Sequence, residues 1–139
     1  MTIHVYYIGK PRDRRLAAAA EEYLKRASRW TRCRMAELDP RRADFWKRHV
    51  ADRKILLDAA GRQVDSAAFT ELLRQAEMRG QNLVFLIGGA EGLPEGWAQR
   101  ADLLLSLSRL TFAHELARLV LAEQIYRALA ALRGHPYPK

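Results

Sequence analysis

The sequence of 139 residues predicts an α/β domain with a mainly parallel sheet and helices on both faces. Short apolar or β-branched runs alternate with longer amphipathic segments, which is typical of parallel β-α-β units. Residues 83–87 are apolar throughout, as expected of a strand that is buried on both faces. The length and the 49% hydrophobic content suit one domain, residues 1–139, with its own core.

The first part of the chain predicts three strands and two helices. Residues 3–8 form a β-rich run, and residues 12–30 carry Ala, Leu, Glu and Lys with apolar side chains at helical spacing. Residues 33–38 predict a second strand, and residues 43–50 a weak helix. The apolar run at 54–58 predicts a third strand.

The second part of the chain continues the alternation. Residues 59–62 predict a loop at the carboxyl end of the third strand. Ser66 is the expected N-cap of a helix that ends at Gly80. After the strand at 83–87, a short helix precedes the next strand, at 103–107. A long final helix then extends to Arg133.

The net charge of +8 is unevenly distributed. Residues 1–60 contain 15 Lys and Arg against 8 Asp and Glu, whereas residues 61–139 contain 9 against 8. Such clustering is expected of a protein that binds a polyanion, although a solvated basic surface is the alternative. Trp30 and Trp46 lie among these arginines, where they either stack on bases or serve as core aromatics.

Several classes of protein and site are not expected. No apolar run of about 18 residues and no signal-peptide pattern occurs, so we expect no membrane association and a cytoplasmic location. The single cysteine, Cys33, cannot form an intramolecular disulfide and is expected to be a plain strand residue. Histidines are scattered without paired metal-ligand spacing, so no metal site is expected; they are His4, His49, His114 and His135.

Residues 82–112 contain two strand ends that together predict a pocket. Gly88 and Gly89 follow the buried strand, and the polar loop 106–112 follows the next one. Ligands of open α/β sheets bind beyond the carboxyl ends of strands. The glycines match neither the dinucleotide fingerprint nor a P-loop, so a tight turn without a ligand is the alternative.

The start of the final helix carries His114 and Glu115. Glu115 there either compensates the helix dipole, or these polar side chains point into the pocket. The helix is apolar over a wide arc, which indicates either a partner subunit or a thick core. From the residues alone, the chain is a basic α/β domain with a glycine-lined pocket.

Six blocks of the sequence resemble the RlmH family of SPOUT-class methyltransferases, which act on a pseudouridine of large-subunit (23S) ribosomal RNA. The blocks are residues 22–26, 57–61, 85–93, 105–114, 118–127 and 135–137. The resemblance implies a parallel sheet with a deep C-terminal trefoil knot. It also implies a homodimer that uses S-adenosylmethionine to methylate N3 of the pseudouridine on the assembled ribosome.

Matching motif to motif, the resemblance assigns cofactor-binding positions to Leu57, Gly88, Leu107, Ser108, Arg109, Leu110, Thr111 and Phe112. Removal of the N3 proton needs a base, or a cation that stabilises the anion. Candidates for this chemistry and for contacts with the flipped-out base are His114, Arg118, Arg127, His135 and Tyr137, and all of these except Arg127 are expected to be catalytic residues. The two tail residues are the better candidates for the base contacts.

The sequence departs from the family pattern at a few positions. Ala90 and Ala113 stand where the family usually has proline, Pro138 stands where it often has histidine, and the segment 39–54 is shorter than usual. Two other functions remain open at this point. One is a SPOUT methyltransferase that acts on another RNA, such as tRNA, and the other is a non-catalytic ribosome-binding protein of the same fold.

Overall fold

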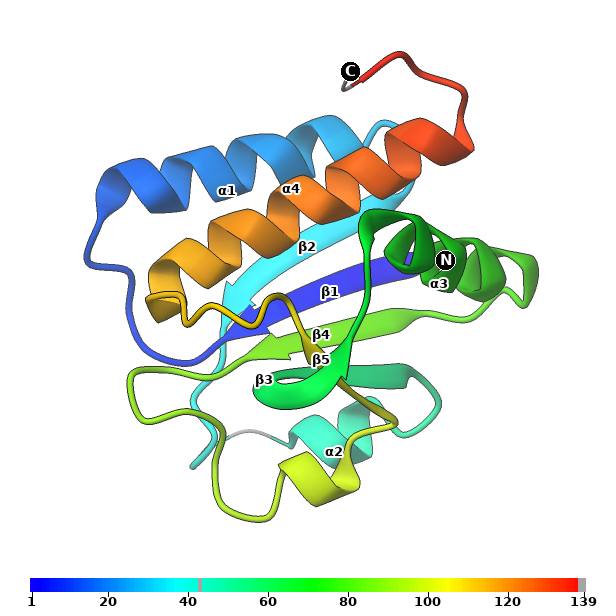
Figure 1. Ribbon diagram of the computed structural model, residues 1–139. Coiled ribbons are helices and arrows are strands. Elements are labelled where there is room, and N and C mark those ends of the chain that lie inside the picture. The colour runs from blue at the N-terminus through cyan, green and yellow to red at the C-terminus, as the bar shows by residue number, and fades with distance from the viewer. Residues whose placement is uncertain (43, 138–139) are drawn as a thin grey trace.

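The computed structural model describes residues 1–42 and 44–137 as a five-stranded parallel sheet with helices on both sides (Figure 1). The strands, in sheet order β2-β1-β4-β3-β5, are β2 Arg32–Glu37, β1 Thr2–Tyr7, β4 Leu83–Ile87, β3 Arg53–Gln63 and β5 Leu103–Ser106. The helices are α1 Arg14–Ala27, α2 Phe45–Arg48, α3 Ser66–Met78 and α4 His114–Leu132, with a short 3₁₀ helix η1 at Ala98–Arg100. The predicted fold class is confirmed.

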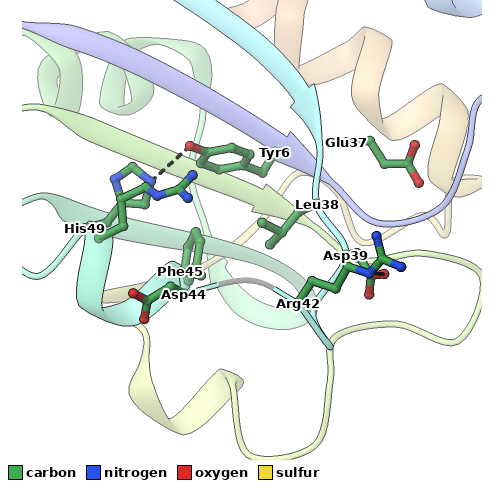
Figure 2. Close-up of a pocket in the computed structure, with 9 residues that line it drawn as sticks. Tyr6, Glu37, Leu38, Asp39, Arg42, Asp44, Phe45 and His49 are labelled. Atoms are coloured by element: carbon green, nitrogen blue, oxygen red, sulfur yellow. Dashed lines mark hydrogen bonds and ion pairs between the residues drawn. The ribbon is translucent and has the colours of Figure 1, made fainter.

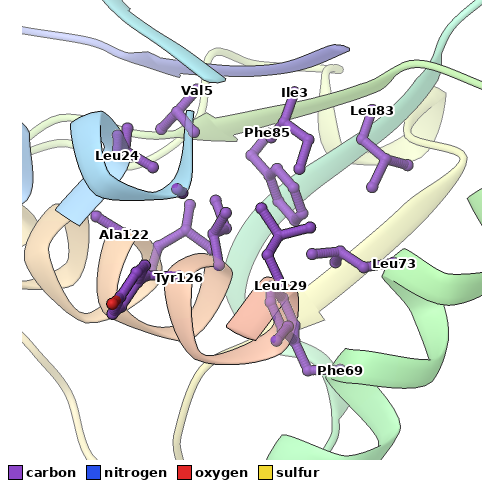
Figure 3. Close-up of a cluster of buried hydrophobic side chains, with 14 of the residues drawn as sticks. Ile3, Val5, Leu24, Phe69, Leu73, Leu83, Phe85, Ala122, Tyr126 and Leu129 are labelled. Atoms are coloured by element: carbon purple, nitrogen blue, oxygen red, sulfur yellow. The ribbon is translucent and has the colours of Figure 1, made fainter. Parts of the chain in front are cut away.

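The two faces of the sheet are covered unequally. Successive side chains of β4 point to opposite faces of the sheet. Phe85 therefore faces α1, α3 and α4, and Leu86 faces α2 and η1. The three long helices cover the larger core, part of which is drawn in Figure 3. The opposite core is smaller and centres on Phe45 of α2 and the neighbouring Trp97.

The strand β3 is longer than predicted, because it continues through residues 59–62, which we expected to form a loop. Its pairing with β5 shifts register between Leu57 and Arg62. At Gly61 a side chain has no room, since a β-carbon there would lie 2.7 Å from the carbonyl group of Leu104. This close crossing of β3 and β5 is consistent with the implied knot, which remains an expectation from the resemblance.

The cap of α3 also differs from the prediction. Asp65, rather than Ser66, is the N-cap, and its carboxylate accepts a hydrogen bond of 2.8 Å from the Ala68 amide. Ser66 is the first helical residue and donates instead to the side chain of Gln124 on α4, at 2.8 Å. Asp65 therefore caps α3, and Ser66 connects α3 to α4.

The wide apolar arc of α4 is explained largely by the core. The helix lies between α1 and α3 (Figure 1), and residues on both of its sides are buried. Tyr126 contacts Tyr23 of α1 with ring centroids 5.8 Å apart. Leu116 stays 37% exposed, so one part of the arc faces solvent in this chain.

The two tryptophans of the basic region are core aromatics. Trp30 stacks on Tyr126 at 5.6 Å, and Trp46 contacts Trp97 edge-on at 5.3 Å. Cys33 lies in β2, as predicted, and burial raises the pKa of its thiol to about 12. None of the helices in the described ranges is both long and apolar enough to cross a lipid bilayer.

Candidate active site

A cavity of about 320 Å³ lies at the carboxyl ends of β4 and β5 and beside residues 57–59 in the middle of β3. Seven of the eight predicted cofactor positions line it: Leu57, Gly88, Leu107, Ser108, Leu110, Thr111 and Phe112. The eighth, Arg109, has an exposed side chain outside the cavity wall. The pocket expected from two strand ends also includes the middle of β3, because β3 lies between β4 and β5 in the sheet.

The turn after β4 forms one wall of the cavity with its backbone. A β-carbon on Gly88 would lie 2.5 Å from the carbonyl carbon of Gly92, so a side chain at Gly88 would collide with the turn. The Gly92 amide donates to the Gly89 carbonyl at 2.9 Å, and Gly92 has a φ of 81°. The glycines thus make a closed turn whose main chain a ligand can approach.

The loop after β5 is held by its own serines. The Ser106 hydroxyl donates to the Ser108 carbonyl at 2.9 Å, and the Leu110 amide donates to the Ser108 hydroxyl at 2.9 Å. Ser106 is 2% exposed. These bonds shape the loop without long side chains, which leaves backbone groups of residues 107–112 along the cavity.

Sequence reasoning missed several lining residues, of which Asp58 is the most informative. Its carboxylate accepts a 2.7 Å hydrogen bond from the Ala60 amide and is the one acidic side chain among the residues that line this cavity. Gly92, Leu93 and Ala117 also line it. The position of Asp58 after a strand's apolar run was the available signal.

His114 and Glu115, at the start of α4, point to different places. His114 lines the cavity. The Glu115 carboxylate accepts hydrogen bonds from the backbone amides of Arg12, at 2.7 Å, and Asp13, at 3.1 Å. These bonds lower the pKa of Glu115. Glu115 therefore fastens the loop between β1 and α1 to α4.

Arg118 holds the same loop one turn further along. It is 4% exposed and donates from Nη2 to the carbonyls of Ile8 and Gly9, both at 3.1 Å. Its guanidinium lies 4.2 Å from the centroid of the Tyr7 ring, and burial lowers its pKa. Arg118 does not line the cavity in this chain, so its expected catalytic role stays a prediction.

The predicted tail residues lie far from the cavity of their own chain. The Tyr137 hydroxyl donates to Glu123 at 2.8 Å, and its ring lies 4.6 Å from that of Tyr126. His135 packs edge-on against Trp30 at 5.3 Å. A helix of 19 residues spans about 28 Å, so His135 lies a helix length from His114.

One further candidate, Arg127, lies in this tail cluster. Arg127 donates to Glu123 at 2.8 Å, so it shares that carboxylate with Tyr137. Burial, followed by hydrogen bonds to Tyr23 and Glu123, raises the pKa of Tyr137. Pro138 lies outside the described residues.

A second, smaller cavity of about 130 Å³ lies at the other edge of the sheet, beside α2 (Figure 2). His49 is 4% exposed there and connects Tyr6, at 3.0 Å, with Asp52, at 2.8 Å. This network fastens α2 to β1. Within residues 1–42 and 44–137, no group of three or more His, Cys, Asp or Glu is arranged to hold a metal ion.

Comparison with known proteins agrees with the geometry. The family model described as Predicted SPOUT methyltransferase matches residues 1–138. A protein of Solibacter usitatus named Ribosomal RNA large subunit methyltransferase H is 56% identical over 137 residues, which cover 99% of each chain. The protein of that name from Thermus thermophilus is 40% identical, over 99% of this chain and 98% of its own.

Solved structures support the fold at low sequence identity. A methylase-family protein from Haemophilus influenzae superposes with a TM-score of 0.65 at 10% identity, covering 99% of this chain and 70% of that one. A methylase-family protein from Neisseria gonorrhoeae gives 0.62 at 12% identity, covering 89% and 81%. With the family match over nearly the whole chain, these findings establish that the chain belongs to the SPOUT methyltransferase family.

Proposed function

We propose that this enzyme transfers a methyl group from S-adenosylmethionine to N3 of a pseudouridine in large-subunit ribosomal RNA, on the assembled ribosome. One observation carries the proposal. Seven of the eight positions that the family resemblance assigns to the cofactor converge on a single cavity. The names of the similar proteins support the ribosomal RNA as substrate.

The cavity suits the proposed cofactor in size and chemistry. A volume of about 320 Å³ falls within the range of pockets for small ligands. Leu57, Leu93 and Leu107 offer apolar surface for a nucleobase, and the Gly88 turn allows close approach of the main chain. The Asp58 carboxylate offers an acceptor for hydroxyl or ammonium groups. These residues are the ones we propose to hold the cofactor.

The chemistry places modest demands on the protein. S-adenosylmethionine supplies an electrophilic methyl group on a positively charged sulfur, so alignment with the nucleophile is the main requirement. N3 of pseudouridine carries an imide proton, which must leave as the N–C bond forms. His114 lines the cavity and is the candidate in this chain to accept that proton.

We propose a homodimer in which the tail of one subunit reaches the cavity of the other. His135 and Tyr137 lie about a helix length from their own cavity, so a contribution to catalysis requires a second subunit. Leu110, which is 73% exposed, and Leu116, which is 37% exposed, give an apolar surface beside the cavity for that contact. A cytoplasmic location follows from the ribosomal substrate.

Cofactor binding and substrate choice together test the proposal. Calorimetry with S-adenosylmethionine should show one site per chain. Labelled methyl donor should then modify ribosomes or large subunits in preference to free ribosomal RNA and tRNA. Transfer to tRNA alone would support another SPOUT specificity, and failure to bind the cofactor would support a non-catalytic ribosome-binding protein.

The tail has its own test. In single-turnover reactions, Tyr137→Phe and His135→Ala should slow methyl transfer while cofactor affinity stays unchanged. Mixing a tail variant with a His114→Ala variant should restore part of the activity if sites are shared between subunits. Undiminished rates in both tail variants would remove these residues from the site.

A further inference from the structure

Exposed arginines lie on the face of the sheet that carries α2, opposite the three long helices. β2 is an edge strand, and its residues Arg32 and Arg34 are exposed. They pair in register with Thr2 and His4 of β1. Registered neighbours in a parallel sheet point to the same face, and the alternation along β1 puts this on the face that carries α2, where Tyr6 packs.

Arg48 extends this row from α2. It is exposed and lines the small cavity together with Tyr6 and His49. The His49 ring lies 5.2 Å from that of His4, which is the neighbour of Arg34 across the strands. We call Arg32, Arg34 and Arg48 the cationic strip; His4 and His49 lie between its members.

The charges of the cationic strip are free to meet a ligand. Within the part of the chain that the structure describes, none of its three arginines forms an ion pair with a carboxylate. In contrast, four arginines on the helix-covered side do so: Arg26 with Glu22, Arg74 with Glu71, Arg127 with Glu123 and Arg133 with Glu77. An unpaired guanidinium retains its capacity to bind phosphate.

The strip is also held in place by buried structure. His49 bonds to Tyr6 and Asp52, and the Lys54 ammonium donates to the His49 carbonyl at 2.9 Å, so the end of α2 is fixed against the sheet. Arg32 and Arg34 are two residues apart on a strand, a separation of about 6.6 Å. That distance is comparable with the spacing of successive phosphates along a nucleic-acid strand.

Acidic residues line the small cavity together with Arg48, at one end of the strip. Glu37, Asp39 and Asp44 border the small cavity at the carboxyl end of β2, and Asp39 pairs with Arg41 and Arg42. The amino-terminal half of β2 carries no acidic residue. A polyanion is therefore favoured along the first half of β2 and disfavoured at its far end.

We propose that the cationic strip binds the sugar-phosphate backbone of the substrate RNA, at a segment separate from the nucleotide that reacts. The strip lies on the β2 edge of the sheet, whereas the cavity lies at the ends of β4 and β5 and beside the middle of β3. Its arginines thus add affinity without touching the reacting atoms. The identity of the polyanion as RNA rests on the proposed function.

Two triple variants of equal charge test this. Arg32→Gln, Arg34→Gln and Arg48→Gln together remove the strip. Lys25→Gln, Arg26→Gln and Arg74→Gln remove three charges from exposed positions on α1 and α3. Binding of a fluorescently labelled RNA hairpin is followed by anisotropy over a salt series. The slope of log affinity against log salt concentration is negative. In the strip variant its magnitude should decrease by about 2 to 3, and in the matched control by less than about 1.

Kinetics and rescue sharpen the test. The strip variant should raise KM for the RNA substrate at least tenfold while kcat and cofactor affinity stay unchanged. The Arg→Lys version of the strip should keep most of the salt slope, since it keeps the charge. Retained fold is checked by thermal unfolding, and if the glutamine variant unfolds, the lysine variant and single substitutions supply the same comparison.

Three results would overturn the proposal. Equal losses in the two triple variants would mean that total charge, not this surface, determines binding. Unchanged RNA binding with lost binding to phosphatidylserine vesicles would assign the strip to a membrane surface. A fall in kcat with unchanged KM would place the arginines in catalysis. If the wild-type protein binds RNA through the strip but transfers no methyl group, the proposed function is wrong, and the proposal that the strip binds RNA is still supported.

Discussion

A β-carbon built on Gly88 would lie 2.5 Å from the carbonyl carbon of Gly92, a distance that no side chain tolerates. Gly88 also lines the cavity of about 320 Å³ that we propose to hold the cofactor. We therefore predict that Gly88→Ala opens the turn and weakens binding of S-adenosylmethionine at least tenfold, about 1.4 kcal/mol, as measured by calorimetry.

Gly80→Ala is the matched control for that substitution. A β-carbon there meets nothing within 4 Å, and the residue follows α3, away from the cavity. Its φ of 62° makes alanine cost about 1 kcal/mol of stability, with cofactor affinity unchanged. Equal affinities for the Gly88→Ala protein and wild type would show that this turn is not part of the cofactor site.

The crossing at Gly61 gives a prediction about stability. Alanine there would place its β-carbon 2.7 Å from the Leu104 carbonyl, so β3 and β5 must move apart. We expect Gly61→Ala to lower the free energy of unfolding by about 2 kcal/mol or more, as measured by urea denaturation. Ala60→Ser, at the exposed neighbouring residue, should change it by less than about 0.5 kcal/mol. Similar values for the two variants would contradict the close crossing.

We expect substitution of Arg118 to affect the stability of the fold more than the rate of methyl transfer. Methionine at this position fills similar space but loses two hydrogen bonds from a charged donor and the contact with Tyr7. We expect Arg118→Met to lower the free energy of unfolding by about 2–4 kcal/mol in thermal or urea denaturation. Arg118→Lys, which keeps the charge, should lose less. Full stability with a large fall in kcat would instead make Arg118 a catalytic residue.

Glu115 gives a pH-dependent prediction. Backbone hydrogen bonds from Asp13 and Arg12 lower its pKa below the ordinary value of 4.5. Because the folded-state pKa is the lower one, this stabilisation is present above pH 4.5 and is lost as pH falls through the folded-state pKa. Glu115→Gln should therefore be less stable than wild type at neutral pH, and the gap should narrow in acid. A gap that stays constant with pH would contradict an ionic role.

The elements that the sequence predicted well are those with local periodicity. The apolar run at 83–87 and the helical spacing before Arg133 identify β4 and α4 directly. The extension of β3 was missed because it depends on contact with β5, some 40 residues later. The Ser66 hydroxyl suits an N-cap, which is why the sequence predicts it there, but the preceding Asp65 holds the position.

The candidate site also has a part that the sequence predicts and a part that depends on contacts between distant residues. The predicted strand ends and the family motifs can both be identified along the sequence, and together they located the cavity. The roles of Glu115 and Arg118 could not be predicted, because their partners lie more than 100 residues earlier in the chain. His135 and Tyr137 do not line the predicted cavity in their own chain, so their predicted role depends on the second subunit that we propose.

The central claim is tested most directly by finding the methylated nucleoside. Ribosomes that lack the modification are incubated with the protein and S-adenosylmethionine, and the nucleosides of each RNA are then analysed by mass spectrometry. The account predicts one new N3-methylpseudouridine per large-subunit RNA. A methyl group found only in tRNA, or on another atom of the large-subunit RNA, would contradict it.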